Sequence, residues 1–196
     1  YNQRDRFVEG YMWYDVPKLL LQLEIEYKDG SKETIISDQS WKTTTGPILH
    51  DAIFTGEIYD ARLELGSWNQ AGYDDSAWKS VLSVRPPTGM LRVQTVAFTK
   101  IMGTVDTYFE QANDSLFVFT LPETVAGWCE LSVKGQAGDT VKLRFISDEG
   151  LSYGQEDMYI LRGGQNERWE PRFTWHAFKK VEVTATQGVE ISKQSI

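Results

Sequence analysis

Two carboxylates in one short stretch, Glu57 and Asp60, are the first residues of this sequence that could do chemistry. Glycoside hydrolysis uses a pair of carboxyl groups that flank the scissile bond. Residues three apart in a β-strand point to opposite faces of the sheet, so the two carboxyl groups could hardly act together as general acid and general base on one bond. An independent glycoside hydrolase that uses this pair is therefore an alternative that the spacing disfavours, and we assign no catalytic residue.

A calcium site is a better interpretation of the acidic residues, because Ca²⁺ takes several oxygen ligands from loops. The candidate ligands are Glu57, Asp60, Asp74 and Asp75, which lie within one short region but match no EF-hand spacing. A competing interpretation places Asp74 and Asp75 in a turn before Trp78, where side-chain oxygens accept backbone N–H bonds. No cofactor is required, and calcium is the one candidate.

Arg62, Trp68 and Trp78 are the candidate sugar-binding residues. Indole rings offer flat faces on which a sugar could stack, although a Trp buried in a β-sandwich is the commoner outcome. For Arg62 an ion pair with Glu57 or Asp60 is at least as well supported as a contact with ligand. These residues thus indicate a calcium-assisted sugar-binding module as a further alternative.

Other catalytic motifs are missing from the sequence. It has no Gly-x-Ser-x-Gly elbow and no Walker loop, and Cys129 falls in a strand-like run where burial makes a thiol inert. His50 and His176 are far apart and have no His or Cys partner at ligand spacing, so a zinc site has little support.

Charge and hydropathy exclude two classes of partner. The 28 acidic and 20 basic residues give a net charge of −8, which argues against nucleic acid but leaves a neutral glycan open. The longest apolar stretch, Leu19–Leu21, is far too short for a membrane span. The isolated Cys129 does not identify the compartment, and a periplasmic or extracellular location is favoured over the cytoplasm.

Hydrophobic periodicity predicts an all-β fold. Apolar and polar residues alternate over Leu21–Tyr27, as in a strand with one buried face, and Asp29-Gly30 predicts a hairpin with a return strand at Thr34–Ile36. Further strand-like runs include Val93–Thr99 and Thr140–Ile146. No window has a sustained apolar helical face, so we expect no helix longer than about two turns.

A connector at Arg85-Pro86-Pro87 predicts two β-sandwich domains, 1–85 and 86–196, because paired prolines favour an extended chain. The first domain contains only five or six recognisable strands. A complete jelly roll has about eight, which leaves open that this domain is incomplete. Residues 1–16 would then have to supply a neighbour for the Leu21–Tyr27 strand.

An ordered series of motifs runs through nearly the whole chain. In the first half they are Tyr27-x-Asp29-Gly30, Asp38-x-x-Trp41, Gly46-Pro47-Ile48, Gly56-Glu57-Ile58-Tyr59-Asp60-Ala61-Arg62 and Tyr73-Asp74-Asp75-Ser76-Ala77-Trp78. In the second half they are Ala126-Gly127-Trp128, Gly135-x-Ala137-Gly138-Asp139 and Trp169-x-Pro171-x-Phe173-Thr174-Trp175-His176. In type and order, this series resembles the bacterial α-L-rhamnosidases.

The resemblance implies a jelly-roll domain like a carbohydrate-binding module, which in some members binds rhamnose with the help of calcium, followed by a concanavalin-like sandwich. It also implies an inverting hydrolase that removes terminal α-L-rhamnose, with its acidic catalytic residues in a helical toroid. The periodicity shows no such helices. We therefore expect a non-catalytic accessory region, inactive alone, that packs on the catalytic domain of the same protein and meets a glycan or rhamnoside through it.

Overall fold

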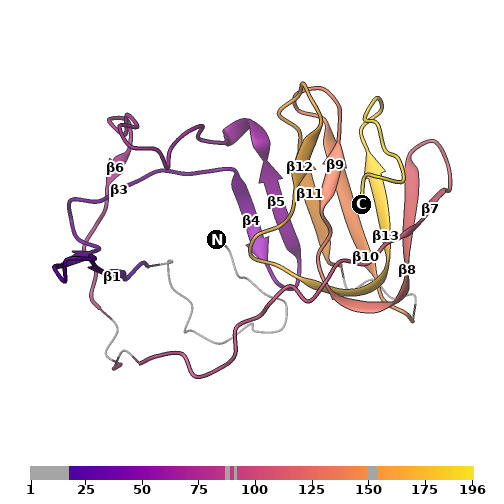
Figure 1. The fold of residues 1–196 in the computed structure, drawn as a ribbon. Coiled ribbons are helices and arrows are strands. Elements are labelled where there is room, and N and C mark those ends of the chain that lie inside the picture. Colours follow the sequence, from indigo (N-terminus) through magenta and orange to yellow (C-terminus); the bar gives the residue numbers. More distant parts are fainter. Residues whose placement is uncertain (1–17, 87–88, 91, 150–153) are drawn as a thin grey trace. The chain divides into compact units, whose positions relative to one another are not determined.

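In the part of the chain that the structure describes, strands form all the regular structure apart from one 3₁₀ turn (Figure 1). The computed structural model describes residues 18–86, 89–90, 92–149 and 154–196. No α-helix occurs in these ranges, and the all-β prediction is confirmed. The elements are β1 (Gln22–Glu26), β2 (Lys32–Ile36), β3 (Lys42–Thr43), β4 (Ile48–Ala52), β5 (Gly56–Asp60), η1 (Ala61–Leu63), β6 (Lys79–Ser80), β7 (Tyr108–Gln111), β8 (Leu116–Gly127), β9 (Leu131–Val133), β10 (Thr140–Ile146), β11 (Glu156–Ile160), β12 (Glu167–Trp169) and β13 (His176–Ala185).

The chain divides into two compact units of discontinuous segments. Among the described residues, the first comprises 46–66 and 104–196, and the second comprises 18–45 and 67–103 without the gaps given above. The domain division at residue 85 stays a prediction, and the strand expected from residues 1–16 lies outside the described residues. Among the residues that the structure describes, no helix is long and apolar enough to cross a membrane.

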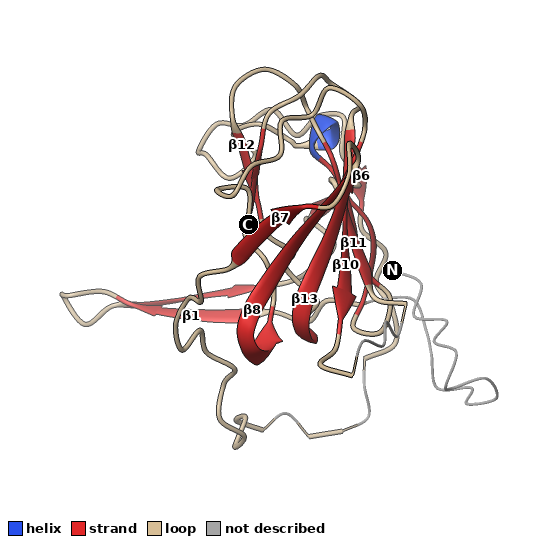
Figure 2. Ribbon diagram, turned by 90° about the vertical axis from the view of Figure 1, so that its right-hand side faces the viewer, coloured by secondary structure: helices blue, strands red, loops and turns tan. Residues whose placement is uncertain are grey.

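A seven-stranded sheet dominates the first unit, in the order β4-β5-β11-β10-β13-β8-β7. Figure 2 shows its strands β11, β10, β13, β8 and β7 side by side. All neighbours are antiparallel except β5 and β11, which run parallel with Tyr59 opposite Tyr159. The hairpin β4–β5 therefore adds an early part of the chain to strands that come about 100 residues later. This edge of the sheet carries the Gly56–Arg62 stretch.

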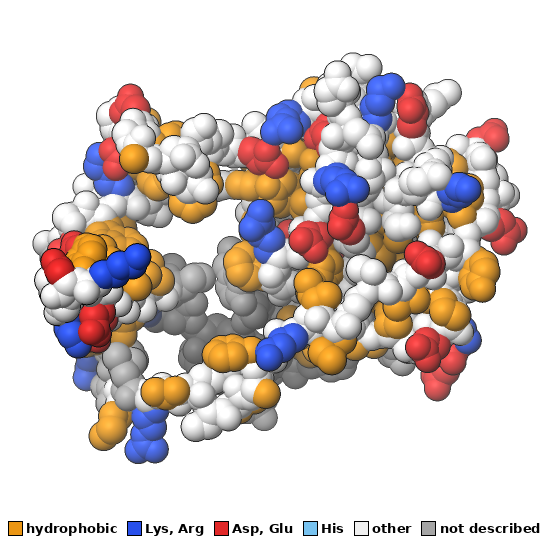
Figure 3. All heavy atoms as spheres, in the orientation of Figure 1, with side chains coloured by type: hydrophobic (Ala, Val, Ile, Leu, Met, Phe, Trp, Pro, Cys, Tyr) orange, Lys and Arg blue, Asp and Glu red, His pale blue; other side chains and the backbone are white. Residues whose placement is uncertain are grey.

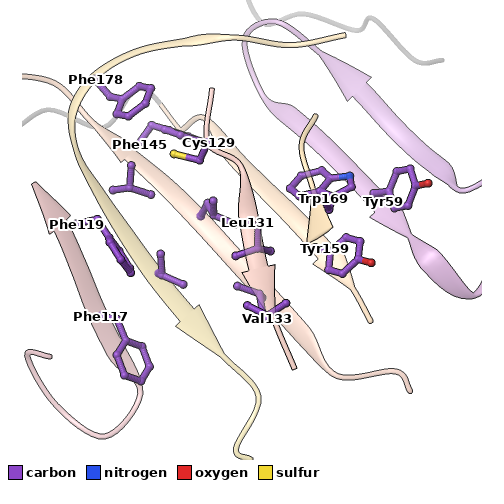
Figure 4. Packing of buried hydrophobic residues seen from close by; sticks show 14 of the residues in the cluster. Tyr59, Phe117, Phe119, Cys129, Leu131, Val133, Phe145, Tyr159, Trp169 and Phe178 are labelled. Carbon is purple, nitrogen blue, oxygen red and sulfur yellow. The ribbon is translucent and has the colours of Figure 1, made fainter. Parts of the chain in front are cut away.

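The core lies between this sheet and the two-stranded sheet β9–β12. Alternate residues of β10 point inward, as its period-two pattern predicts, and they pack with Leu131 of β9 and Trp169 of β12. Figure 4 shows Tyr59, Tyr159 and Trp169 together at one end of this cluster and Phe117 and Phe119 at the other. The first unit is thus a sandwich with an aromatic end beside β5.

The pairing of β13 with β8 shifts register between Phe178 and Lys180. Phe178 is opposite Val125, whereas Lys180 is opposite Thr120, so β8 has extra residues at this point. Pro122 lies among these extra residues, and proline cannot donate a ladder hydrogen bond. A bulge here lets β8 continue through a proline.

Acidic and basic side chains are interspersed on the face of the first unit that Figure 3 presents. Several of them pair across the surface, including Lys142 with Glu156 at 3.3 Å and Arg162 with Glu64 at 2.7 Å. Such exposed pairs contribute little stability, about 0–1 kcal/mol each. The stability of this unit therefore comes from its core and its buried polar contacts.

The second unit contains two small sheets, β1–β2 and β3–β6. The predicted hairpin is confirmed, with Gly30 at φ +84° in its turn. The predicted buried face is wrong, since Leu23 is 49 % exposed and no third strand among the described residues joins the hairpin. The predicted strand at Val93–Thr99 is also wrong, because this apolar run pairs with no described strand.

We expect Gly56→Ala to destabilise the chain by about 2 kcal/mol or more. Gly56 has φ +98°, and a Cβ there would lie 2.2 Å from the backbone oxygen of Glu156, so the contact between β5 and β11 would have to open. Urea unfolding followed by tryptophan fluorescence measures the change. Gly46→Ala is the matched control, since a Cβ at Gly46 meets no atom within 4 Å; equal effects of both substitutions would contradict the prediction.

Candidate functional site

The Gly56–Arg62 stretch forms β5 and the 3₁₀ turn η1, at the edge where β5 meets β11. Asp60 is the N-cap of η1, and its Oδ1 accepts a hydrogen bond from the backbone N–H of Arg62 at 3.1 Å. An aspartate in an extended conformation before a helical turn is a favoured cap. The carboxylates of Glu57 and Asp60 are thus positioned by a strand that ends in a capped 3₁₀ turn.

The predicted ion pair of Arg62 is with Asp60. Nε of Arg62 lies 2.8 Å from Oδ1 of Asp60, and Nη2 lies 2.7 Å from Oδ2, which is a bidentate geometry. These hydrogen bonds are the main reason that the pKa of Asp60 is below its ordinary value. Both oxygens of Asp60 thus contact the chain itself, and the Arg62 side chain remains 48 % exposed.

Glu57 points the other way and is completely buried. Its Oε2 accepts hydrogen bonds from the backbone N–H groups of Arg172 at 3.0 Å and Phe173 at 3.3 Å, whereas its Oε1 has no partner among the described residues. Burial is the main reason that the pKa of Glu57 is raised. The two backbone N–H bonds lower this pKa, and the nearby carboxylates of Asp157 and Asp51 raise it further. Glu57 therefore fixes the segment after β12 in place. It is not accessible to solvent, as a catalytic acid or base would have to be.

Asp157 connects this anchor to a buried histidine. Its Oδ1 accepts a hydrogen bond from the backbone N–H of Glu57 at 2.9 Å, and its Oδ2 lies 3.0 Å from Nε2 of His176. The His176 ring is fully buried and stacks on Phe145 with a centroid distance of 3.8 Å. The four residues Glu57, Asp157, His176 and Phe145 form what we call the buried polar cluster, which links β5, β11, β13 and β10.

A hollow of about 560 Å³ opens in the first unit where Glu57 holds the segment after β12. Four aromatic residues line it, Tyr59, Trp128, Trp169 and Phe173. Tyr59 and Trp169 both contact Tyr159, with centroid distances of 5.9 and 5.3 Å. The Nε1 of Trp169 is buried and has no hydrogen-bond partner among the described residues.

Charged groups also line the hollow, namely Glu64, Glu130, Glu170, Arg168 and Arg172. Oε2 of Glu170 accepts a hydrogen bond from the indole N–H of Trp128 at 2.6 Å. Arg168 lies 3.5 Å from Glu130, but the guanidinium of Arg172 has no ion-pair or hydrogen-bond partner in the described part of the chain. The hollow therefore combines four aromatic residues with five charged ones, which makes its lining more polar than that of most small-molecule sites.

The remaining candidate residues lie in the second unit. Trp68 is 58 % exposed, and half-buried Trp78 packs edge-on against Tyr73 at 5.8 Å. Oδ1 of Asp74 accepts the backbone N–H of Ser76, as the turn interpretation expects, and this bonding lowers the pKa of Asp74. Asp75 pairs with Lys42 at 2.7 Å.

The four candidate calcium ligands are divided between the two units. Glu57 and Asp60 belong to the first unit and Asp74 and Asp75 to the second. In the described ranges, no three His, Cys, Asp or Glu side chains are arranged to hold a metal ion. Calcium binding by these residues stays a prediction without support from this donor set.

Two sequence patterns match the chain. The pattern for the alpha-L-rhamnosidase N-terminal domain matches residues 1–102, and that for the bacterial alpha-L-rhamnosidase concanavalin-like domain matches residues 110–196. The chain belongs to the bacterial α-L-rhamnosidase family. The resemblance found in its motifs is thereby confirmed, as is the concanavalin-like domain.

The relatives are much longer than this chain. An α-L-rhamnosidase of Streptomyces avermitilis is 38 % identical over 189 residues, which cover 88 % of this chain and 18 % of the relative. One from Formosa agariphila is 35 % identical over 196 residues, covering 92 % and 21 %. The chain thus spans about a fifth of the length of these α-L-rhamnosidases.

Solved α-L-rhamnosidases share the fold. The structure of the enzyme from Dictyoglumus thermophilum matches with a TM-score of 0.85 and 32 % identity, over 93 % of this chain and 22 % of that one. The Streptomyces avermitilis enzyme in complex with L-rhamnose matches with a TM-score of 0.72 and 34 % identity, over 90 % and 18 %.

Sequence reasoning did not find the buried polar cluster or the hollow. Asp157 lies 100 residues from Glu57, and no local spacing relates them. The motif Trp169-x-Pro171-x-Phe173 was a usable signal for the hollow, because its residues line it. It served only as a mark of the family.

Glu57→Gln should change how stability depends on pH. The folded chain holds the Glu57 proton more tightly than the unfolded chain, because the folded pKa is raised above its ordinary value of 4.5. The resulting stability is complete below that value and is lost as pH rises through the folded pKa. The unfolding free energy of the wild type minus that of Glu57→Gln should therefore fall as pH increases, measured by urea unfolding at several pH values.

Asp60→Asn provides a control of opposite sign. The pKa of Asp60 is lowered in the folded chain, so its contribution is present at neutral pH and is lost as pH falls. The prediction for Glu57 is wrong if both differences change with pH in the same direction.

Asp157→Ala should destabilise the chain by about 3 kcal/mol, because it leaves a buried N–H of Glu57 and the buried ring of His176 without their partner. Thermal and urea unfolding measure the loss. Asp148→Ala is the control, since among the described residues Asp148 forms only an exposed pair with Lys179; this variant should stay within about 0.5 kcal/mol of the wild type.

Proposed function

We propose that this chain is the non-catalytic accessory part of an α-L-rhamnosidase. In this proposal it packs on a helical catalytic domain of the same protein, which hydrolyses terminal α-L-rhamnose from a glycan or glycoside. The observation that carries the proposal is that family members match this chain over only 18–21 % of their length. The rest of such an enzyme has ample length for a separate catalytic domain.

The bonding of the carboxylates supports the same proposal. Glu57 is fully buried and holds two backbone N–H groups, and both oxygens of Asp60 contact Arg62. A general acid must reach the proton that it transfers. The alternative of an independent hydrolase that uses Glu57 and Asp60 therefore has little support from their geometry.

A sugar-binding role is the second candidate, and the exposure of Trp68 favours it. An indole that is 58 % exposed can offer a face to a sugar ring. The Streptomyces avermitilis relative was solved in complex with L-rhamnose, which makes this sugar the natural probe for the present chain. In the calcium-assisted module proposed from the sequence, a bound Ca²⁺ would help to hold the sugar.

The purified chain should release no rhamnose from an aryl α-L-rhamnoside, because the groups that could act as acid and base are engaged in structural bonds. Release of the aryl group, followed by absorbance, is the measurement. Glu57→Gln and Asp60→Asn should behave as the wild type does. Turnover that survives repurification and disappears in Glu57→Gln would overturn the accessory role.

A further inference from the structure

We propose that the hollow beside β12 binds one neutral sugar residue with an apolar face, and that it does so without calcium. The inference rests on the proposed function, which supplies sugar as the class of ligand. It assigns binding to Trp128, Glu170, Arg172 and Phe173, in the first unit. It does not involve the Trp68 region, which lies in the second unit.

Two aromatic side chains provide the apolar contacts. Trp128 is half-buried, and the hydrogen bond from its Nε1 to Glu170 fixes the orientation of its ring. Phe173 is 63 % exposed although its backbone N–H is held by buried Glu57. The Trp128 ring is therefore held in place by its own hydrogen bond, whereas for Phe173 only the backbone is fixed; the ordered indole lowers the entropic cost of binding a sugar.

The polar groups at the hollow have unused bonding capacity. Glu170 uses Oε2 for Trp128, and its Oε1 has no partner within the described ranges. The guanidinium of Arg172 is likewise unpaired in the part of the chain that the structure describes. A carboxylate oxygen accepts from a sugar hydroxyl and a guanidinium donates to one, so both groups can bind hydroxyls of a ligand in the hollow.

Charge and size favour a neutral small ligand. Three glutamates and two arginines line the hollow, a balance that attracts neither anions nor cations strongly. Its volume of about 560 Å³ lies within the usual range of small-molecule sites, about 300–1,000 Å³. A 6-deoxy sugar such as L-rhamnose, with a methyl group and C–H faces beside its hydroxyls, matches both kinds of lining group.

Titration of the ¹⁵N-labelled chain with L-rhamnose in the presence of EGTA tests the proposal, followed through the indole N–H signals of its seven Trp residues. We expect the Trp128 signal to shift and saturate, while the Trp68 signal stays in place. Sugar concentrations up to roughly 100 mM saturate a millimolar site. An unmoved Trp128 signal at that concentration, or a shift that needs calcium, would overturn the proposal.

Variants locate the site. Trp128→Ala should raise the Kd for L-rhamnose about tenfold or more, as loss of a central aromatic contact does. Arg172→Ala removes a side chain that has no hydrogen-bond or ion-pair partner among the described residues, so the variant should fold normally and still raise the Kd several-fold. Trp68→Ala is the matched control and should leave the Kd unchanged. A Kd that rises for Trp68→Ala and not for Arg172→Ala would assign the sugar to the second unit and refute the hollow.

Failure of this proposal and failure of the accessory role give different results. Rhamnose release by the chain would contradict the accessory role, and the Trp128 signal could still be read, because free L-rhamnose has no glycosidic bond that the chain could hydrolyse. If the chain releases no rhamnose and the Trp128 signal does not shift, sugar binding in the hollow is refuted and the accessory role is not.

Discussion

The carboxylate of Asp157 contacts two segments that the sequence places far apart. One oxygen accepts a hydrogen bond from the N–H of Glu57 on β5, and the other lies beside His176 on β13, so a single buried side chain on β11 connects its neighbour β5 with β13, two strands away. Glu57 in turn fixes the backbone of Arg172 and Phe173. Because unpaired polar groups are costly in a dry interior, these contacts specify one position for each segment. The geometry of the hollow depends on these contacts, because Arg172 and Phe173 line it.

Much of the fold was accessible from local patterns. Thr140–Ile146 is a strand with the predicted bounds, and the hairpin around Gly30 forms as expected. These elements are determined by alternation and turn chemistry, which act over a few residues. The strand predicted at Val93–Thr99 did not form, because β propensity expresses itself only where a neighbouring strand completes the hydrogen bonds. The parallel pairing of β5 with β11 has no local signature at all.

The candidate site shows the same division. The pairing of Arg62 with Asp60 could be predicted from sequence, because the residues are two apart at the start of a turn. The role of Glu57 could not, since it depends on burial and on contacts 115 residues away. A carboxylate in a list of acidic residues suggests catalysis or metal binding. The same carboxylate in a closed interior, with two N–H groups on one oxygen, is a structural anchor.

The parallel contact between β5 and β11 has a consequence for how such proteins can be shortened during evolution or in the laboratory. A gene cut at the proline pair near residue 86 would remove β4 and β5 and leave the edge of β11 open, with unpaired backbone groups that invite aggregation. It would also leave Asp157 without the N–H of Glu57. A shortened chain would therefore have to retain this hairpin or replace it to keep the edge of β11 covered.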